Sequence, residues 1–161
     1  MSRNIAGLGR KRPQLNMPIE LLELDVLNPR LAKESKGNSQ LDLLISLYND
    51  FDVEELAYSM AENGYFDEEP IVVIPDKLPS GFKLSSDIEQ QQKDLQGLIA
   101  KGKIKFIVVE GNRRTATLKL LTDDSLRKKL QLSDDFPKPA SPKVADDLKI
   151  VPAIFYPNRD N

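Results

Sequence analysis

Two adjacent arginines, Arg113 and Arg114, are the residues with the clearest capacity for chemistry. They follow an apolar, β-branched run at residues 107–109, which is typical of a buried strand. Gly111 permits a sharp turn after this strand, and Asn112 is predicted to be the N-cap of the helix that comes next. Free N–H groups at a helix N-terminus bind anions, and guanidinium groups add charge-assisted donors. The pattern therefore predicts a phosphate site at this turn.

The position of the two arginines has an energetic cost. Cations in the first turn of a helix oppose the positive end of the helix macrodipole, so they lower stability unless an anion lies beside them. The alternative interpretation is that both side chains lie in solvent or pair with a nearby carboxylate such as Glu110. Thr115 adds a hydroxyl donor to the predicted phosphate site, although threonines inside helices often bond to their own turn.

The segment from Gly111 to Arg114 resembles the Gly-x-Arg-Arg box of the ParB/sulfiredoxin superfamily, best known from the N-terminal domain of the partition protein ParB. Other pieces follow in the family's order: residues 19–30 with their Asn28-Pro29-Arg30 turn, the helix-like segment 53–64, and the strand-like segments 69–74 and 150–154. The resemblance covers residues 19–156. It implies an α+β fold, a single ParB/sulfiredoxin-like domain over residues 17–161 with a small mixed sheet flanked by helices. It also implies that Asn28 and Arg30 add to the nucleotide site.

Several features depart from the family's pattern. Residues 76–103 replace a short hairpin and are expected to form a partly helical insertion. Glu69 stands where the family has glutamine, Asn112 replaces the usual glutamate of the box, and a later Glu-Asn-x-x-Arg box is missing. The helix-turn-helix DNA reader of ParB is missing as well. We therefore expect a minimal domain or the N-terminal piece of a longer protein, with a further domain or a partner protein after residue 161.

The composition narrows the chemistry further. The 161 residues include neither cysteine nor histidine, which excludes disulfides, thiolate or imidazole metal sites, and nucleophilic chemistry of the Ser-His-Asp or Cys-His type. The resemblance carries no sulfiredoxin reaction, because that branch needs a cysteine where Asn112 and Arg113 stand. No apolar run reaches the length of a membrane span, and the start lacks a signal-peptide core, so we expect a cytoplasmic location and no membrane partner.

Acidic and basic residues are concentrated in different segments of the chain, although the formal net charge is only −2. Residues 1–13 carry four bases and no acid, and residues 37–76 carry ten acids and no base. Residues 101–149 carry twelve bases against seven acids. The overall acidity, with a pI near 5.3, argues against indiscriminate coating of nucleic acid, while a local basic site remains compatible with phosphate binding.

Hydrophobic periodicity and chain breakers predict the order of elements. Residues 1–16 are expected to be a flexible basic start, and strands are predicted at 19–26, 71–74, 104–109 and 148–156. Helices are predicted from Ser39, from Asp52 with Glu55 in a capping box and an end at Gly64, from Ser86 to Gly102, from Asn112, and through Leu126 and Leu130. A proline-rich loop at 137–142 precedes the last strand. The strands at 71–74 and 104–109 are predicted to lie in one sheet.

Three classes of function fit these residues. The first is a ParB-like module that binds nucleotide or phosphate in a DNA-maintenance, mobile-element or defence context, with a nucleoside triphosphate and Mg²⁺ as ligands. The second is an enzyme: a metal-dependent nuclease, a CTPase-like NTPase, or a phosphotransferase of the serine-kinase type, with Glu110 and Glu69 as the catalytic carboxylates. Asp67 and Glu68 are further candidates for that role. The third is a non-catalytic protein-interaction domain.

Nuclease activity is expected to be weak or absent in this chain alone. Phosphodiester hydrolysis typically needs a water activated by a base or a metal, and no histidine is present for either task. The acidic stretch at 37–76 repels a phosphate backbone unless metals neutralise it or it faces away. The basic residues between 101 and 149 would still hold DNA in a salt-dependent way.

Overall fold

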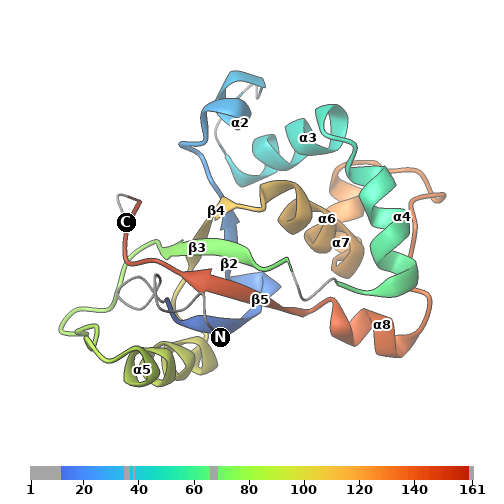
Figure 1. Cartoon of the computed structure of the whole chain (residues 1–161). Coiled ribbons are helices and arrows are strands. Elements are labelled where there is room, and N and C mark those ends of the chain that lie inside the picture. Colours follow the sequence, from blue (N-terminus) through green and yellow to red (C-terminus); the bar gives the residue numbers. More distant parts are fainter. Residues whose placement is uncertain (1–11, 35–36, 38, 66–68, 160–161) are drawn as a thin grey trace, which may run out of the picture.

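A five-stranded mixed sheet forms the centre of the protein in a computed structural model that describes residues 12–34, 37, 39–65 and 69–159 (Figure 1). The strands are β1 Gln14–Pro18, β2 Leu22–Leu24, β3 Ile71–Pro75, β4 Phe106–Glu110 and β5 Ile150–Phe155. Their order across the sheet is β1-β5-β3-β4-β2. β5 is parallel to β3 and β4 to β2, whereas the β1–β5 and β3–β4 pairs are antiparallel. The predicted α+β fold is confirmed, as is the prediction that residues 71–74 and 104–109 lie in one sheet, where β3 and β4 are direct neighbours.

Seven α-helices accompany this sheet in the described part of the chain. Four of them form one group: α3 Gln40–Asp50, α4 Val53–Asn63, α6 Asn112–Thr122 and α7 Asp124–Lys129. Two short helices extend the group, because α2 Pro29–Glu34 packs on α3, and α8 Pro142–Asp147 packs on α4. α5 Ile88–Lys101 lies apart from the others and packs on β1 (Figure 1).

Helix α6 is the centre of the helical group. It contacts α3, α4 and α7 on its outer sides and β2 and β4 of the sheet on its inner side. Its apolar residues Ala116, Leu118, Leu120 and Leu121 are all buried, so the helix has no solvated stripe. A helix that is buried on nearly all sides belongs to a core, and its direction is therefore fixed by packing.

Both edges of the sheet are closed by a glutamine side chain. At the β1 edge, the amide of Gln96 on α5 accepts from the Asn16 N–H at 3.2 Å and donates to the Asn16 carbonyl at 2.9 Å. At the β2 edge, Gln40 on α3 does the same for Leu24, at 2.6 and 2.9 Å. Unpaired edge groups are a template for association with another strand, so these two contacts protect the sheet and dock a helix on each edge.

Two of the predicted helix ends are confirmed. Ser39 caps α3, and Asp42 completes a reciprocal capping box. Gly64, with a φ of +82°, ends α4. The helix expected from Ser86 begins one residue later than predicted, because the side chain of Asp87 accepts the capping bond from the Gln90 N–H.

Other predicted boundaries are wrong. Residues 14–16, expected in the flexible start, belong to β1, in which Leu15 and Met17 alternate inward; residues 1–11 lie outside the described residues. The single strand expected at 19–26 is a 3-10 turn, Ile19–Leu21, followed by β2. Asp52 lies in the left-handed region with a φ of 53° and makes no side-chain cap, so the capping box with Glu55 is absent. The proline-rich loop does not lead directly to the last strand, because α8 begins at its last residue, Pro142, with Ser141 as its cap.

The turn between β4 and α6 depends on Gly111. Its φ is +105°, a conformation that side-chain-bearing residues rarely adopt. A Cβ at this position would lie 2.7 Å from Cγ2 of Ile71, which is fully buried on β3. The strand and the turn are thus packed too closely to accept a side chain.

Replacing Gly111 by alanine should lower the free energy of unfolding by about 1–3 kcal/mol, because the backbone becomes strained and Ile71 must move. The matched control is Gly97→Ala in α5, where an added Cβ meets nothing within 4 Å. That variant should be more stable than the wild type by about 0.5–1 kcal/mol. Urea denaturation measures both changes. A Gly111→Ala protein as stable as the wild type would contradict this reading of the turn.

Candidate functional site

A pocket of about 530 Å³ lies where the N-terminus of α6 meets α2, α3 and α4. Its polar lining residues are Asn28, Arg30, Glu69, Glu110, Gly111, Asn112, Arg113 and Arg114. Its other side is formed by Leu31, Leu47, Phe51, Leu56, Met60, Tyr65 and Val109. Nearly all residues assigned to a site from the sequence therefore surround one space, although they come from segments far apart in the chain. Asp67 and Glu68 lie outside the described residues.

Arg114 crosses from α6 to the segment that enters β3. Its Nη1 donates to the hydroxyl of Tyr65 at 3.0 Å and also to the backbone carbonyl of Glu69. The Tyr65 hydroxyl donates to the same carbonyl at 2.5 Å. The guanidinium is therefore held in place by neutral acceptors, and its positive charge is not cancelled by them.

Arg113 reaches in a different direction, towards the start of α4. Its Nη2 donates to the backbone carbonyl of Asp52 at 2.9 Å. Its Nε is buried and has no hydrogen-bond partner among the described residues. A buried donor without a partner costs about 1–3 kcal/mol, so this N–H has a strong requirement for an acceptor.

Arg30 contributes a third guanidinium on the outer side of the pocket. It lies 5.2 Å from the ring centroid of Phe51, within the range of a cation–π contact. Its backbone N–H is fixed by Oδ1 of Asn28 at 2.9 Å. The ion pairs of the described residues involve Arg127, Lys149 and Arg159, so none of the three guanidiniums at the pocket pairs with a carboxylate from the described part of the chain. The two carboxylates that line the pocket, Glu69 and Glu110, are exposed.

The predicted N-cap role of Asn112 is wrong. Gly111 occupies the cap position and Asn112 is the first residue of α6. The Asn112 side chain is turned into the core, where its Oδ1 accepts from the Asp25 N–H at 3.1 Å and its Nδ2 donates to the Val108 carbonyl at 2.9 Å. No side chain caps the N-terminus of α6. The positive end of the helix is consequently left open towards the pocket.

Thr115 does not line the pocket, although the sequence made it a candidate. Its hydroxyl donates to the Gly111 carbonyl at 2.9 Å, and the hydroxyl of Thr117 donates to the Arg113 carbonyl at 2.8 Å. Both threonines are fully buried. They bond to their own turn of the helix, as threonines inside helices often do.

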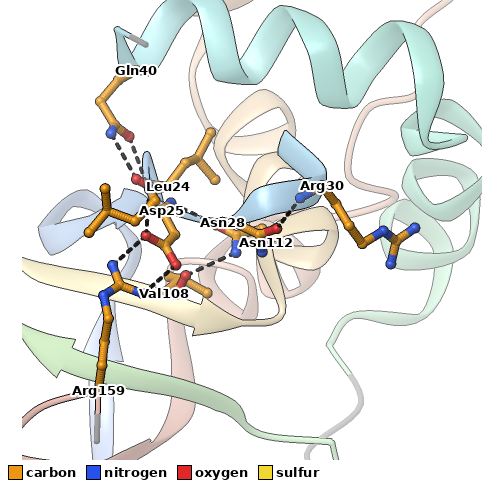
Figure 2. A network of polar contacts seen from close by, with 9 residues as sticks. Leu24, Asp25, Asn28, Arg30, Gln40, Val108, Asn112 and Arg159 are labelled. Carbon is orange, nitrogen blue, oxygen red and sulfur yellow. Dashed lines mark hydrogen bonds and ion pairs between the residues drawn. The ribbon is translucent and has the colours of Figure 1, made fainter. Parts of the chain in front are cut away.

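Behind the pocket lies a polar network that the sequence did not indicate (Figure 2). Asp25, which is buried, forms a two-pronged ion pair with Arg159 at 2.5 and 2.8 Å. This hydrogen-bonded pair raises the pKa of Arg159 above its usual value. Asp25 also accepts from the Leu27 N–H at 3.0 Å. Figure 2 shows Asp25 between Arg159 and Asn112, with the guanidinium of Arg30 directed away from the network.

Tyr65, Asp52 and Asp25 were missed because their roles depend on tertiary contacts. Asp52 and Tyr65 act at the pocket through a backbone carbonyl and a hydroxyl that meet arginines far along the chain. The only sequence signal for Asp25 is an acid that directly follows the last apolar residue of β2, and Glu20 and Glu23 are acids in the same stretch. Such an acid is common at the end of a strand and does not by itself identify a buried ion pair.

Comparisons of the chain with protein-family models, with curated protein sequences and with solved structures gave no match. Within the described ranges, no three histidine, cysteine, aspartate or glutamate side chains gather closely enough to hold a metal ion. None of the helices in the described part of the chain combines the length and apolar character that a membrane crossing requires.

Replacing Asn112 by alanine should lower the free energy of unfolding by about 1–3 kcal/mol, because it leaves the buried N–H of Asp25 and the carbonyl of Val108 without partners. Asn49→Ala, at an exposed position of α3, is the control and should change stability by less than about 0.5 kcal/mol. Chemical denaturation of both variants measures the difference. Equal stability of the two variants would show that the Asn112 amide is not a structural link.

Proposed function

We propose that the chain is a ParB-like module that binds a nucleoside triphosphate or another phosphate group, and that it acts in DNA maintenance, mobile-element biology or defence. The observation that carries this proposal is the gathering, beside an uncapped helix N-terminus, of three guanidiniums that pair with no carboxylate of the described residues. Anions gain from both features, through charge-assisted hydrogen bonds and through the helix dipole. A ParB/sulfiredoxin-like fold is part of the same proposal.

The fold assignment rests on position as well as on motif. The Gly-Asn-Arg-Arg turn joins a central strand to the core helix α6, which is where the resemblance requires a phosphate box. The Asn28-Pro29-Arg30 turn lines the same pocket, although it lies about eighty positions earlier in the chain. Two pieces of the family pattern that lie far apart in the sequence thus line one pocket.

The two sides of the pocket suit the two parts of a nucleotide. A phosphate at the N-terminus of α6 would be within the field of the helix and close to the arginines that line the pocket. The apolar wall that includes Phe51, Leu56 and Met60 suits a nucleobase, because ligand pockets commonly combine apolar walls with a few placed polar groups. Mg²⁺ would be carried into the site by the triphosphate, with Glu69 or Glu110 as available oxygen ligands.

Hydrolysis of the bound triphosphate is the second candidate function. It is favoured by the location of Glu69 and Glu110 on the lining of the same pocket as the arginines. Either carboxylate would orient a water towards the terminal phosphorus and accept its proton, as the new bond from water oxygen to phosphorus forms and the bond from that phosphorus to the nucleoside diphosphate breaks. The guanidiniums would stabilise the charge on the transferred group.

The double variant Arg113→Ala, Arg114→Ala should bind nucleotide more weakly by about 1.5–3 kcal/mol for each charge-assisted contact that is lost. Calorimetric titrations with ATP, CTP and GTP, each with and without Mg²⁺, measure this change. The control is Arg127→Ala. The guanidinium of Arg127 contacts the Leu120 carbonyl and Asp124 outside the pocket, so this variant should bind nucleotide as the wild type does.

Each of these two arginines also holds a backbone carbonyl, so the double variant loses some stability as well. Arg30→Ala separates the two effects, because the Arg30 side chain is exposed and only stacks on Phe51. It should retain the melting temperature of the wild type and still bind nucleotide more weakly. A wild-type protein that binds none of the three nucleotides, or an Arg30→Ala protein with full affinity, would contradict the proposed function.

A further inference from the structure

The segment between β3 and β4 builds a groove with a lysine rim. Lys77, Lys101 and Lys103 surround an apolar floor in a hollow of about 520 Å³. The floor is made by Leu78, Leu98 and Ile104, and the hollow is completed by Pro79 and Ser80. This groove lies where the loop after β3 meets the end of α5, and it shares no residue with the arginine pocket.

The lysines of the groove favour partners with an acidic surface. All three lysines are exposed, and none of them forms an ion pair with a carboxylate in the described part of the chain. Ammonium groups around an apolar floor attract a surface that carries carboxylates together with large apolar or aromatic side chains. The positive charge of the lysines determines which partner approaches. The apolar floor stabilises the contact, because its surface is removed from water when the partner binds.

The opposite kind of surface is present on the α3–α4 side of the same molecule. A hollow of about 510 Å³ is lined by Tyr48, Asn49, Asp52, Glu54, Glu55 and Tyr58. Tyr58 is 54% exposed, and Ile45 on the adjacent helix α3 is 39% exposed. These residues form what we term the acidic face. It has no base nearby in sequence, since residues 37–76 contain neither lysine nor arginine.

The acidic face is suited to receive lysine side chains. The hydroxyl of Tyr48 donates to a carboxylate oxygen of Glu54 at 3.1 Å, so the ring is held at the rim of the hollow. Burial and the adjacent Glu54 raise the pKa of Tyr48, which keeps this hydroxyl protonated. Two tyrosine rings and three carboxylates offer an ammonium group both ion pairs and cation–π contacts.

The two surfaces lie at opposite ends of the molecule. Figure 1 shows α3 and α4 on one side of the sheet and α5 at the far end, below the sheet. A groove and a face that are complementary but well separated cannot meet within one chain. Contact between different patches on two copies is heterologous, so each copy retains one free surface and further copies can add.

We propose that this protein associates head to tail with copies of itself, with the lysine-rimmed groove of one copy seated on the acidic face of the next. The proposal does not require nucleotide binding, because Arg30, Arg113 and Arg114 line neither surface, although Arg113 donates to the backbone carbonyl of Asp52 on the acidic face. The contact joins unlike charges that are exposed to solvent, so it weakens as salt rises.

The test uses two charge-reversal variants of the full chain. The groove variant carries Lys77→Glu, Lys101→Glu and Lys103→Glu; the face variant carries Glu54→Lys and Glu55→Lys. All five positions are exposed, so circular dichroism should show wild-type secondary structure for both. The control variant, Lys128→Glu with Lys129→Glu, changes two exposed lysines of α7 that line neither surface.

Sedimentation velocity should give a wild-type mass that rises with protein concentration at about 50 mM salt and returns to the 18.1 kDa monomer at about 500 mM. The control variant should behave as the wild type, and each charge-reversal variant should remain monomeric alone. An equimolar mixture of the groove and face variants should associate again, because the intact groove meets the intact face and the reversed groove meets the reversed face with unlike charges. A wild-type chain that stays monomeric up to about 1 mM protein at low salt would overturn the proposal, as would a mixture that remains monomeric.

Discussion

The site depends on two hydrogen bonds made by the buried side chain of Asn112. Its amide ties the first turn of α6 to the backbone at Asp25, just after β2, and to the end of β4, so that one residue joins a helix to two parallel strands. Because both partners are buried backbone groups, neither bond is easily replaced by water. The direction of α6 is thereby fixed, and with it the different directions in which Arg113 and Arg114 leave the helix.

The two arginines are held in place without being neutralised. Had they paired with carboxylates, the positive charge at the pocket would have been cancelled and the guanidiniums would gain little from an added anion. Backbone carbonyls instead fix their positions while leaving the charge available. Two like charges beside the positive end of a helix are unfavourable. Under the proposed function a bound anion would reduce that repulsion, and this reduction would contribute to its affinity.

Features that depend on neighbouring residues were predicted from the sequence. Features that depend on contacts between distant parts of the chain were not. The β-branched runs of β3 and β4, the Ser39 cap and the strand–turn–helix at Gly111 follow from neighbouring residues alone. The cap at α6 was misplaced because Asn112 is drawn inward by Asp25 and Val108, which no local rule contains. β1 was missed because its two inward residues are a short signal that becomes clear only through pairing with β5 and the amide of Gln96. The positions of Arg113 and Arg114 after the turn were predicted, whereas the residues that hydrogen-bond to them, such as Tyr65, were not.

The most direct test of the central claim is a titration of ¹⁵N-labelled protein with inorganic triphosphate and Mg²⁺, followed by NMR. An anion at the N-terminus of α6 should shift the backbone amide signals of Asn112, Arg113 and Arg114 most strongly, together with the side-chain Nε–H signals of Arg113 and Arg114, whose side chains line the pocket. These shifts should saturate together at one affinity. Shifts confined to exposed lysines, with the amide signals of residues 112–114 unchanged, would contradict the account.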